Sequence, residues 1–160
     1  MPQTTDKDAC ELLDADHLAV KHLFVEYARL AMAQPRESAA QREALATRIC
    51  DELTVHAQIE EEIFYPALRQ AVPDAADIVD EGIEEHAEAK ELIARLRDED
   101  AAGDAMDALV SQLARAIEHH VKEERDELFP KARAAAGMDL AAIGQQLRDR
   151  QQELVASVAA

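Results

Sequence analysis

The sequence predicts an all-α fold: an antiparallel up-down-up-down four-helix bundle with a short additional C-terminal helix. The 160 residues contain only four glycines and five prolines among abundant alanine, leucine, glutamate and arginine, a composition that favours helix. Apolar residues recur at steps of three and four through four long segments, as they do on the buried face of a helix. Short breaks separate these segments, so we expect consecutive helices to pack antiparallel.

The first two helices are bounded by prolines. We expect the first over residues 8–33, because helical periodicity stops just before Pro35. The second is expected over residues 38–72, with Ser38 suited to an N-cap. Pro66 lies inside this second segment, where we expect a kink because proline has no backbone N–H to donate.

The remaining helices follow from the same periodicity. The third is expected over about residues 74–97 and the fourth over about 104–136, where Gly137 is a natural C-terminal cap. A fifth, amphipathic helix is expected over about 139–155, packed on the outside of the bundle. The bundle itself would then occupy about residues 8–136.

Composition and charge limit the classes of function. A hydrophobic fraction of 48% is enough to bury one core, and we expect a single domain over residues 1–160. The formal charge of -17 disfavours nucleic acid and anionic membrane surfaces as partners. The sequence has neither a secretory leader pattern nor a membrane-length apolar run, which predicts a cytoplasmic protein. Cys10 and Cys50 form no CxxC pair and are expected to be small apolar residues on helices.

One short pattern occurs twice in the chain. A histidine is followed by three residues and a glutamate, and then by an aromatic residue and a proline, in His56-x3-Glu60 and again in His120-x3-Glu124. Residues four apart stack on one face of a helix, so each pair presents an imidazole and a carboxylate to the same point. This is the spacing of metal ligands.

The apolar stripe of every bundle helix is interrupted by histidine, and in two helices also by glutamate. Those that fall on the inward faces are His17, His56, Glu60, His86, His120 and Glu124. A carboxylate buried without a partner costs several kcal/mol, and no lysine or arginine shares these positions. A cation is the simplest compensation. The repeat predicts two metal ions with each glutamate bridging the pair, and mixed imidazole and carboxylate ligands favour iron, although zinc or manganese can take the same ligands.

Other polar residues near these positions have a less certain role. His22 is expected on the surface, His119 lies one position off the buried face, and Glu61 and Glu123 border the ligands on a mostly solvated face. Tyr65 is expected to pack in the core, with an approach to the metals as the alternative. The sequence has no Glu-x-x-His and no His-Glu-x-x-His pair, which excludes ferritin-type carboxylate bundles and the zinc hydrolases of that motif.

The chain resembles the hemerythrin-like, or HHE cation-binding, family over about residues 8–136. The matching features are Asp16-His17, His56-x3-Glu60-Glu61 with Tyr65-Pro66, Glu85-His86, and His119-His120 with Glu123-Glu124 and Phe129-Pro130. The resemblance implies a four-helix bundle that holds two non-haem iron ions joined by an oxo or hydroxo bridge. It also implies the metal ligands His17, His56, Glu60, His86, His120 and Glu124, with Glu60 and Glu124 as the bridging carboxylates.

The chain departs from the oxygen-carrying members of that family in two places. Those members have a second histidine one turn before the ligand of the third helix, where this sequence has Gly82, and they end with His-x4-Asp in place of His120-x3-Glu124. One metal would then lack an imidazole, unless His22, Tyr65 or an acidic neighbour replaces it. These departures disfavour reversible oxygen carriage.

Three functions are consistent with the sequence. The preferred one is a di-iron protein that binds iron and small ligands (O2, NO or peroxide) in storage, sensing or stress protection, with a redox partner still to be identified. The alternative is an enzyme that decomposes hydrogen peroxide in a catalase-like or peroxidase-like cycle. The third is a structural bundle whose histidines are incidental or bind zinc.

Overall fold

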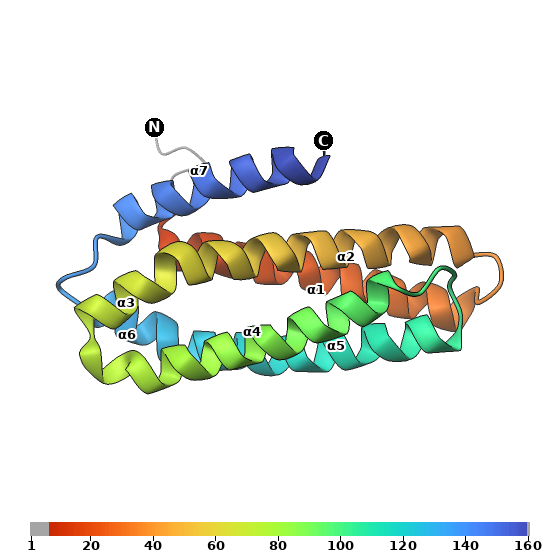
Figure 1. The fold of residues 1–160 in the computed structure, drawn as a ribbon, viewed down its shortest axis with the longest axis horizontal. Coiled ribbons are helices and arrows are strands. Elements are labelled where there is room, and N and C mark those ends of the chain that lie inside the picture. The colour runs from red at the N-terminus through yellow and green to blue at the C-terminus, as the bar shows by residue number, and fades with distance from the viewer. Residues whose placement is uncertain (1–6, 160) are drawn as a thin grey trace.

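The computed structural model describes residues 7–159, and the parts of this range with regular secondary structure are helical. Four long rods lie side by side along one axis, and a further helix packs across the outside (Figure 1). The elements are α1 (Ala9–Ala33), α2 (Ala39–Ile59), η1 (Glu60–Phe64), α3 (Tyr65–Ala71), η2 (Pro73–Ala75), α4 (Ala76–Arg97), α5 (Asp104–Glu123), η3 (Glu124–Leu128), α6 (Phe129–Ala134) and α7 (Leu140–Ala159).

The rods are the four predicted helices of the bundle. Two of them, α1 and α4, are single helices, whereas α2, η1 and α3 form one composite rod and α5, η3 and α6 form another. The expected single domain over residues 1–160 stays a prediction, and it includes residues 1–6 and 160, which lie outside the described residues. None of the helices within the described range is both long and apolar enough to span a membrane.

Helix α1 starts with a capping box. The Asp8 carboxylate accepts from the backbone N–H of Glu11 at 2.9 Å, and the Glu11 carboxylate accepts from that of Asp8 at 3.1 Å. Ser38 precedes α2 as predicted, but its side chain does not cap the helix. Its hydroxyl instead donates to the Leu30 carbonyl of α1 and accepts from the buried Arg42 side chain of α2. Ser38 therefore links two helices and does not accept from a free backbone N–H at the start of α2.

The prediction of a Gly137 cap was wrong. The last rod ends at Ala134, and Ala135 leaves the helix with an extended backbone. No described glycine adopts the left-handed conformation that such a cap requires. The following helix, α7, extends four residues beyond the predicted end at residue 155. It packs against α1 and α2.

The sequence predicted a kink at Pro66, and the structure has a wider helical turn directly before this proline. Each composite rod contains a π-helical turn directly before its aromatic-proline pair, at Glu60–Phe64 and Glu124–Leu128. In these turns the N–H of Tyr65 donates to the Glu60 carbonyl, five residues back, and that of Phe129 donates to the Glu124 carbonyl. Because proline has no N–H, the α-helical ladder is already broken there, and the wider turn absorbs the break. Both turns start at a predicted ligand.

Two apolar clusters lie along the bundle axis. One includes Leu13, Ile59 and Phe129, and the other includes Val20 and Leu53. Their positions in α1 show what separates them, because His17 falls between Leu13 and Val20 in the sequence. The core is therefore divided by a layer of polar residues, which is where the predicted ligands lie.

Candidate metal centre

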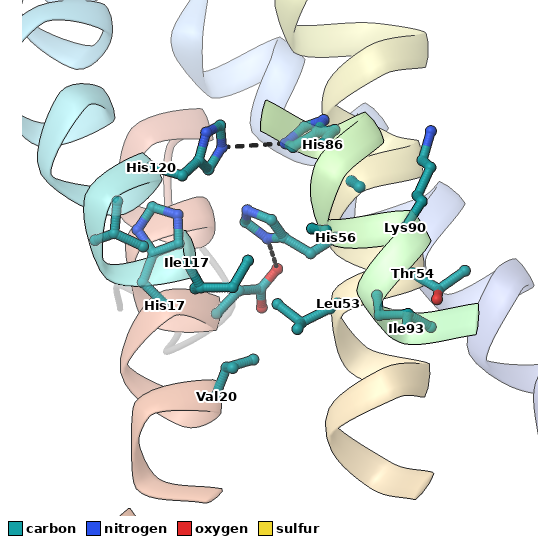
Figure 2. A pocket seen from close by; sticks show the side chains of 14 residues that line it. His17, Val20, Leu53, Thr54, His56, His86, Lys90, Ile93, Ile117 and His120 are labelled. Carbon is teal, nitrogen blue, oxygen red and sulfur yellow. Dashed lines mark hydrogen bonds and ion pairs between the residues drawn. The ribbon is translucent and has the colours of Figure 1, made fainter. Parts of the chain in front are cut away.

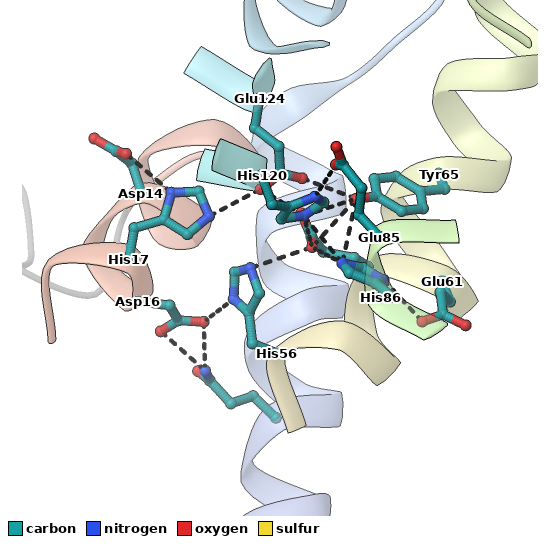
Figure 3. Close-up of polar contacts among 12 residues, drawn as sticks. Asp14, Asp16, His17, His56, Glu61, Tyr65, Glu85, His86, His120 and Glu124 are labelled. Atoms are coloured by element: carbon teal, nitrogen blue, oxygen red, sulfur yellow. Dashed lines mark hydrogen bonds and ion pairs between the residues drawn. The ribbon is translucent and has the colours of Figure 1, made fainter. Parts of the chain in front are cut away.

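The six predicted ligands meet in the layer between the two apolar clusters. They come from all four rods of the bundle (Figure 3). Glu60 and Glu124 have no exposed surface, and none of the four histidines is more than 7% exposed. The helical periodicity thus predicted the correct inward face at each of these positions, even though each is polar.

The ligands form two adjacent groups. His17, His56 and Glu124 make the first, and Glu60, His86 and His120 make the second, with the ligand atoms of each group within 4.8 Å of one another. We refer to them as the first and second metal positions.

Each glutamate contacts both groups. Glu60 Oε1 lies 3.2 Å from His56 Nε2 and 3.1 Å from His86 Nε2. Glu124 Oε1 lies 2.8 Å from His17 Nε2 and 3.5 Å from His120 Nε2. Both carboxylates are therefore placed between the two metal positions, as bridging ligands would be.

A carboxylate orients every histidine of the centre. The Nδ1 atoms lie 3.2, 3.0, 2.8 and 2.8 Å from carboxylate oxygens, in the pairs His17–Asp14, His56–Asp16, His86–Glu61 and His120–Glu85. A carboxylate beside Nδ1 accepts its proton, so an imidazole held in this way can turn an Nε2 lone pair toward a bound cation. Such carboxylate–histidine pairs are typical of metal ligands.

The resulting arrangement brings several proton acceptors close together. The Nε2 atoms of His86 and His120 lie 3.1 Å apart. His56 Nε2 and Glu60 Oε2 are buried and have no hydrogen-bond partner. Metal–ligand bonds of about 2.0–2.2 Å at right angles place neighbouring donor atoms roughly 3 Å apart, which is close to the spacing found here. The residues present fit a pair of metal ions.

The electrostatics of the centre also favour a cation. Burial would lower the pKa of His120, but the carboxylates of Glu124 and Glu60 outweigh burial and raise it to about 10. Burial and the neighbouring Glu60 carboxylate raise the pKa of Glu124. Without metal, protons would gather here to offset the two buried carboxylates. A bound cation replaces those protons, which couples metal binding to proton release.

Tyr65 reaches the centre as well as packing in the core. Its hydroxyl donates to Glu124 Oε2 at 3.0 Å and lies 3.3 Å from His120 Nε2 and 3.4 Å from His86 Nε2. Only 1% of the residue is exposed, so the core-packing expectation is confirmed, and the hydroxyl also contacts three of the candidate ligands. Burial and the carboxylates of Glu124 and Glu60 raise the pKa of Tyr65 well above its ordinary value. The hydroxyl adds an oxygen donor beside the second metal position.

The other residues whose role the sequence left undecided lie outside the cluster of six candidate ligands. His22 is exposed on α1. His119 is 65% exposed and contacts Glu85 and Glu123 at 3.2 and 3.1 Å. Glu61 contacts His86 at Nδ1 rather than Nε2, so it orients this histidine from outside. Sequence reasoning missed the outer carboxylates Asp14 and Asp16, although the Asp16-His17 pair was visible.

A small cavity adjoins the centre. All four histidines line it on one side, and Val20, Leu53, Ile93 and Ile117 lie on the other (Figure 2). Its volume of about 20 Å³ is enough for one molecule of about the size of water. The cavity therefore offers an apolar space beside the metal positions to a very small ligand.

Comparisons with known proteins agree with this description. The family model of the hemerythrin HHE cation binding domain matches residues 8–132. The fold is similar to the crystal structure of a hemerythrin HHE cation binding domain-containing protein from Mycobacterium kansasii, with a TM-score of 0.75 and 21% identity over 94% of this chain and 89% of that one. No curated protein matches the chain. From the match over most of its length, the chain belongs to the hemerythrin HHE cation-binding domain family.

Proposed function

We propose that this chain holds two iron ions and binds a small ligand, O2, NO or peroxide, in storage, sensing or stress protection. The supporting observation is the convergence of four Nε2 atoms on two buried carboxylates, with His86 Nε2 and His120 Nε2 only 3.1 Å apart. In this proposal Glu60 and Glu124 bridge the ions. The first ion is held by His17 and His56 and the second by His86 and His120.

The donor set is the reason to propose iron. The centre combines imidazole, carboxylate and the phenol oxygen of Tyr65, and both cysteines lie in the apolar clusters instead. Sites of imidazole and carboxylate are common for iron, whereas thiolates would favour zinc or a cluster. When bound, the iron pair would supply redox and Lewis-acid chemistry.

The two metal positions are unequal in a way that supports ligand binding. Tyr65 lies within reach of the second position, whereas the first has only His17, His56 and the shared carboxylates. The first ion would therefore keep more coordination positions free. The adjoining apolar cavity of about 20 Å³ limits the ligand to a few atoms.

Metal content and absorption test this proposal directly. The purified chain would be loaded with ferrous iron without oxygen, freed of excess metal, and exposed to air. We expect about two irons per chain and ferric absorption bands that shift when azide is added. Zinc alone, or no metal at all, would contradict the di-iron proposal.

Peroxide decomposition is the second candidate, and Tyr65 is the observation that favours it. Its O–H is a proton donor at the centre, bonded to Glu124 and unable to exchange freely with solvent. A buried phenol can hold a proton that peroxide chemistry needs. Continuous oxygen release from hydrogen peroxide by the iron-loaded chain would establish this activity. Binding of one peroxide equivalent without turnover would instead favour the ligand-binding function.

A further inference from the structure

The carboxylates that orient the four histidines are themselves held by a third layer of side chains. Arg125 donates to Asp14 at 2.6 Å, Lys90 to Glu61 at 3.1 Å, and His119 contacts Glu85 at 3.2 Å. The first two are cations, and the third becomes one when it is protonated. Arg125 and Lys90 therefore withdraw negative charge from the carboxylates that they contact.

The carboxylate behind His56 has a different kind of partner. Both oxygens of Asp16 accept from the side-chain amide of Gln151, at 3.1 and 3.0 Å, and one of them also faces His56 Nδ1 at 3.0 Å. An amide donates hydrogen bonds but carries no charge. The open cavity beside Asp16 has a volume of about 400 Å³ and is lined further by Asp51 and Glu52, with no lysine or arginine among its described lining residues.

Gln151 also differs from the other partners in its origin. It belongs to α7, whereas the family match ends at residue 132. The neighbouring Arg150 binds Glu62 of η1 at 2.8 Å, which ties α7 to the rod that carries His56. Gly144 lets α7 approach closely, because a Cβ there would lie 2.7 Å from the Lys7 carbonyl oxygen. The outer helix is thus fixed against the bundle at several points, one of which is Asp16 behind His56.

We propose that Gln151 is a positioning residue that holds Asp16 without adding a counter-charge, and that His56 is thereby more electron-donating than His17 and His86, whose carboxylates contact a cation. A hydrogen bond from Nδ1–H to an uncompensated carboxylate increases the basicity of the ligating Nε2 atom. A more basic ligand stabilises the ferric state over the ferrous state. The outer helix would therefore lower the reduction potential of the first ion relative to the second. This inference rests on the proposed di-iron function.

Changing the charge of two of these outer side chains, Gln151 and Lys90, tests this inference. Gln151→Lys places a cation on Asp16 and should raise the midpoint potential of one of the two iron reduction steps. Lys90→Gln removes the cation from Glu61 and should lower the potential of the other step. A general loss of stability would not shift the midpoint potentials of the two variants in opposite directions. Lys90 is 53% exposed, so its variant should fold even if the change at Gln151 disturbs α7.

Matched variants control for charge effects that do not pass through the histidines. Gln152→Lys adds the same charge at an exposed position of α7, and Lys122→Gln removes one at a position of α5 that is 75% exposed. Both should shift the potentials much less than the paired variants do, because solvent screens exposed charges. Equal shifts from Gln152→Lys and Gln151→Lys would overturn the inference.

A second readout does not depend on iron. In the zinc-loaded chain, the Nδ1 proton of each histidine gives its own NMR resonance, whose position reports the strength of its hydrogen bond. Gln151→Lys should move the resonance of His56 upfield and leave that of His86 unchanged. Lys90→Gln should move the resonance of His86 downfield and leave that of His56 unchanged. An unchanged His56 resonance would overturn the inference alone. A wild-type chain that binds no metal would overturn it together with the proposed function.

Discussion

The hydroxyl of Tyr65 occupies the space that a side chain at position 82 would need. An ideal Cβ built on Gly82 would lie 3.0 Å from Tyr65 Oη and 3.3 Å from Cζ. Oxygen-carrying relatives are expected to have a histidine at that position. In this chain, the absence of a side chain on α4 leaves room for an oxygen donor from the neighbouring rod.

Replacing Tyr65 with phenylalanine removes the phenol oxygen and keeps the buried aromatic ring. We expect iron-loaded wild-type protein to show a visible charge-transfer band from phenolate to ferric iron, because a nearby cation favours the ionised phenol. Tyr65→Phe should lose this band, retain both irons, and lose about 1–2 kcal/mol of stability with its hydrogen bond. Absorption, metal analysis and thermal unfolding measure these three effects.

Tyr27 provides the matched control for that variant. It is also a buried tyrosine, 2% exposed, and its hydroxyl donates to Asp107 at 2.7 Å in the other half of the bundle. Tyr27→Phe should lower stability by a similar amount and leave the visible spectrum unchanged. If both variants keep the wild-type spectrum, Tyr65 does not bind the metal.

Gly82→Ala tests the same relationship from the other side. The new Cβ would press on the Tyr65 hydroxyl, and the ring is too well buried to swing away. Overpacking costs about 1–3 kcal/mol, of which the better helix propensity of alanine returns about 1 kcal/mol. We therefore expect a weakened or shifted phenolate band with a modest decrease in the unfolding temperature.

Gly103→Ala makes the same chemical change away from any contact. A Cβ at this position meets no atom within 4 Å, so neither the spectrum nor the metal content should change. A full-strength phenolate band in Gly82→Ala, equal to that of Gly103→Ala, would mean that the hydroxyl can move without loss and that Gly82 is not needed for its approach.

The helices and the buried positions of the six candidate ligands could be predicted from the sequence, because both depend on local periodicity. Histidine and glutamate four residues apart must share a helix face, and the apolar stripe identifies which face is buried. The apolar neighbours of each ligand therefore carried enough information to place it. Neither tertiary contacts nor distant residues were needed.

The position of Tyr65 could not be predicted in this way. At 100° per residue, a residue five positions after Glu60 would point about 140° away from it on an α-helix. The π turn changes this relation, because the Tyr65 N–H pairs with the Glu60 carbonyl. Both side chains then face the same centre. Pro66 was visible in the sequence, but its effect on the turn before it was not.

The Gln151–Asp16 contact was even less accessible to sequence reasoning. The two residues are 135 positions apart, and their contact depends on how α7 packs over α1. An amphipathic pattern predicts that a helix packs, but it does not determine which polar side chains meet at its edge. The outer layer of the site therefore required the structure.

Glu60→Ala should remove at least one metal ion. Glu60 is wholly buried and contacts histidines of both groups, so its loss opens both metal positions. Bound metal at one hundred times its Kd stabilises the fold by about 2.7 kcal/mol, and the variant should lose most of that increment. The difference in unfolding temperature with and without iron measures it.

Two exposed residues serve as controls for Glu60→Ala. Glu91→Ala is the same substitution on the surface of α4, and His22→Ala removes an imidazole from the surface of α1. Both should keep two irons and the wild-type gain in stability on loading. Metal loss in His22→Ala with full retention in Glu60→Ala would show that the inward faces have been assigned wrongly.

The two thiols should be unreactive in the folded protein. Burial raises the pKa of Cys10 to about 12 and that of Cys50 to about 11, and neither is more than 1% exposed. Because the thiolate is the reactive form, a raised pKa leaves almost none at pH 8. A thiol-specific chromogenic disulfide should react with no cysteine in native protein and with both after denaturation.

This result also bears on peroxide. If the thiols are inert, they cannot account for peroxide consumption by the iron-loaded protein. Cys10→Ala and Cys50→Ala variants should then consume hydrogen peroxide at the wild-type rate. Rapid thiol labelling of the native protein would contradict the burial of these residues in the two apolar clusters.

Gly144→Ala should loosen α7 from the bundle. The added Cβ would lie 2.7 Å from the Lys7 carbonyl oxygen and 2.9 Å from the Ala9 nitrogen, and backbone atoms cannot turn aside as a flexible side chain can. The helix must move, which we expect to cost about 1–3 kcal/mol. Gly137→Ala is the control, because its nearest contact would be an ordinary 3.6 Å to Ala71 Cβ. Thermal unfolding should separate the two variants, and in the zinc-loaded chain only Gly144→Ala should shift the His56 Nδ1 resonance. Equal stability of both variants would show that α7 does not depend on this close approach.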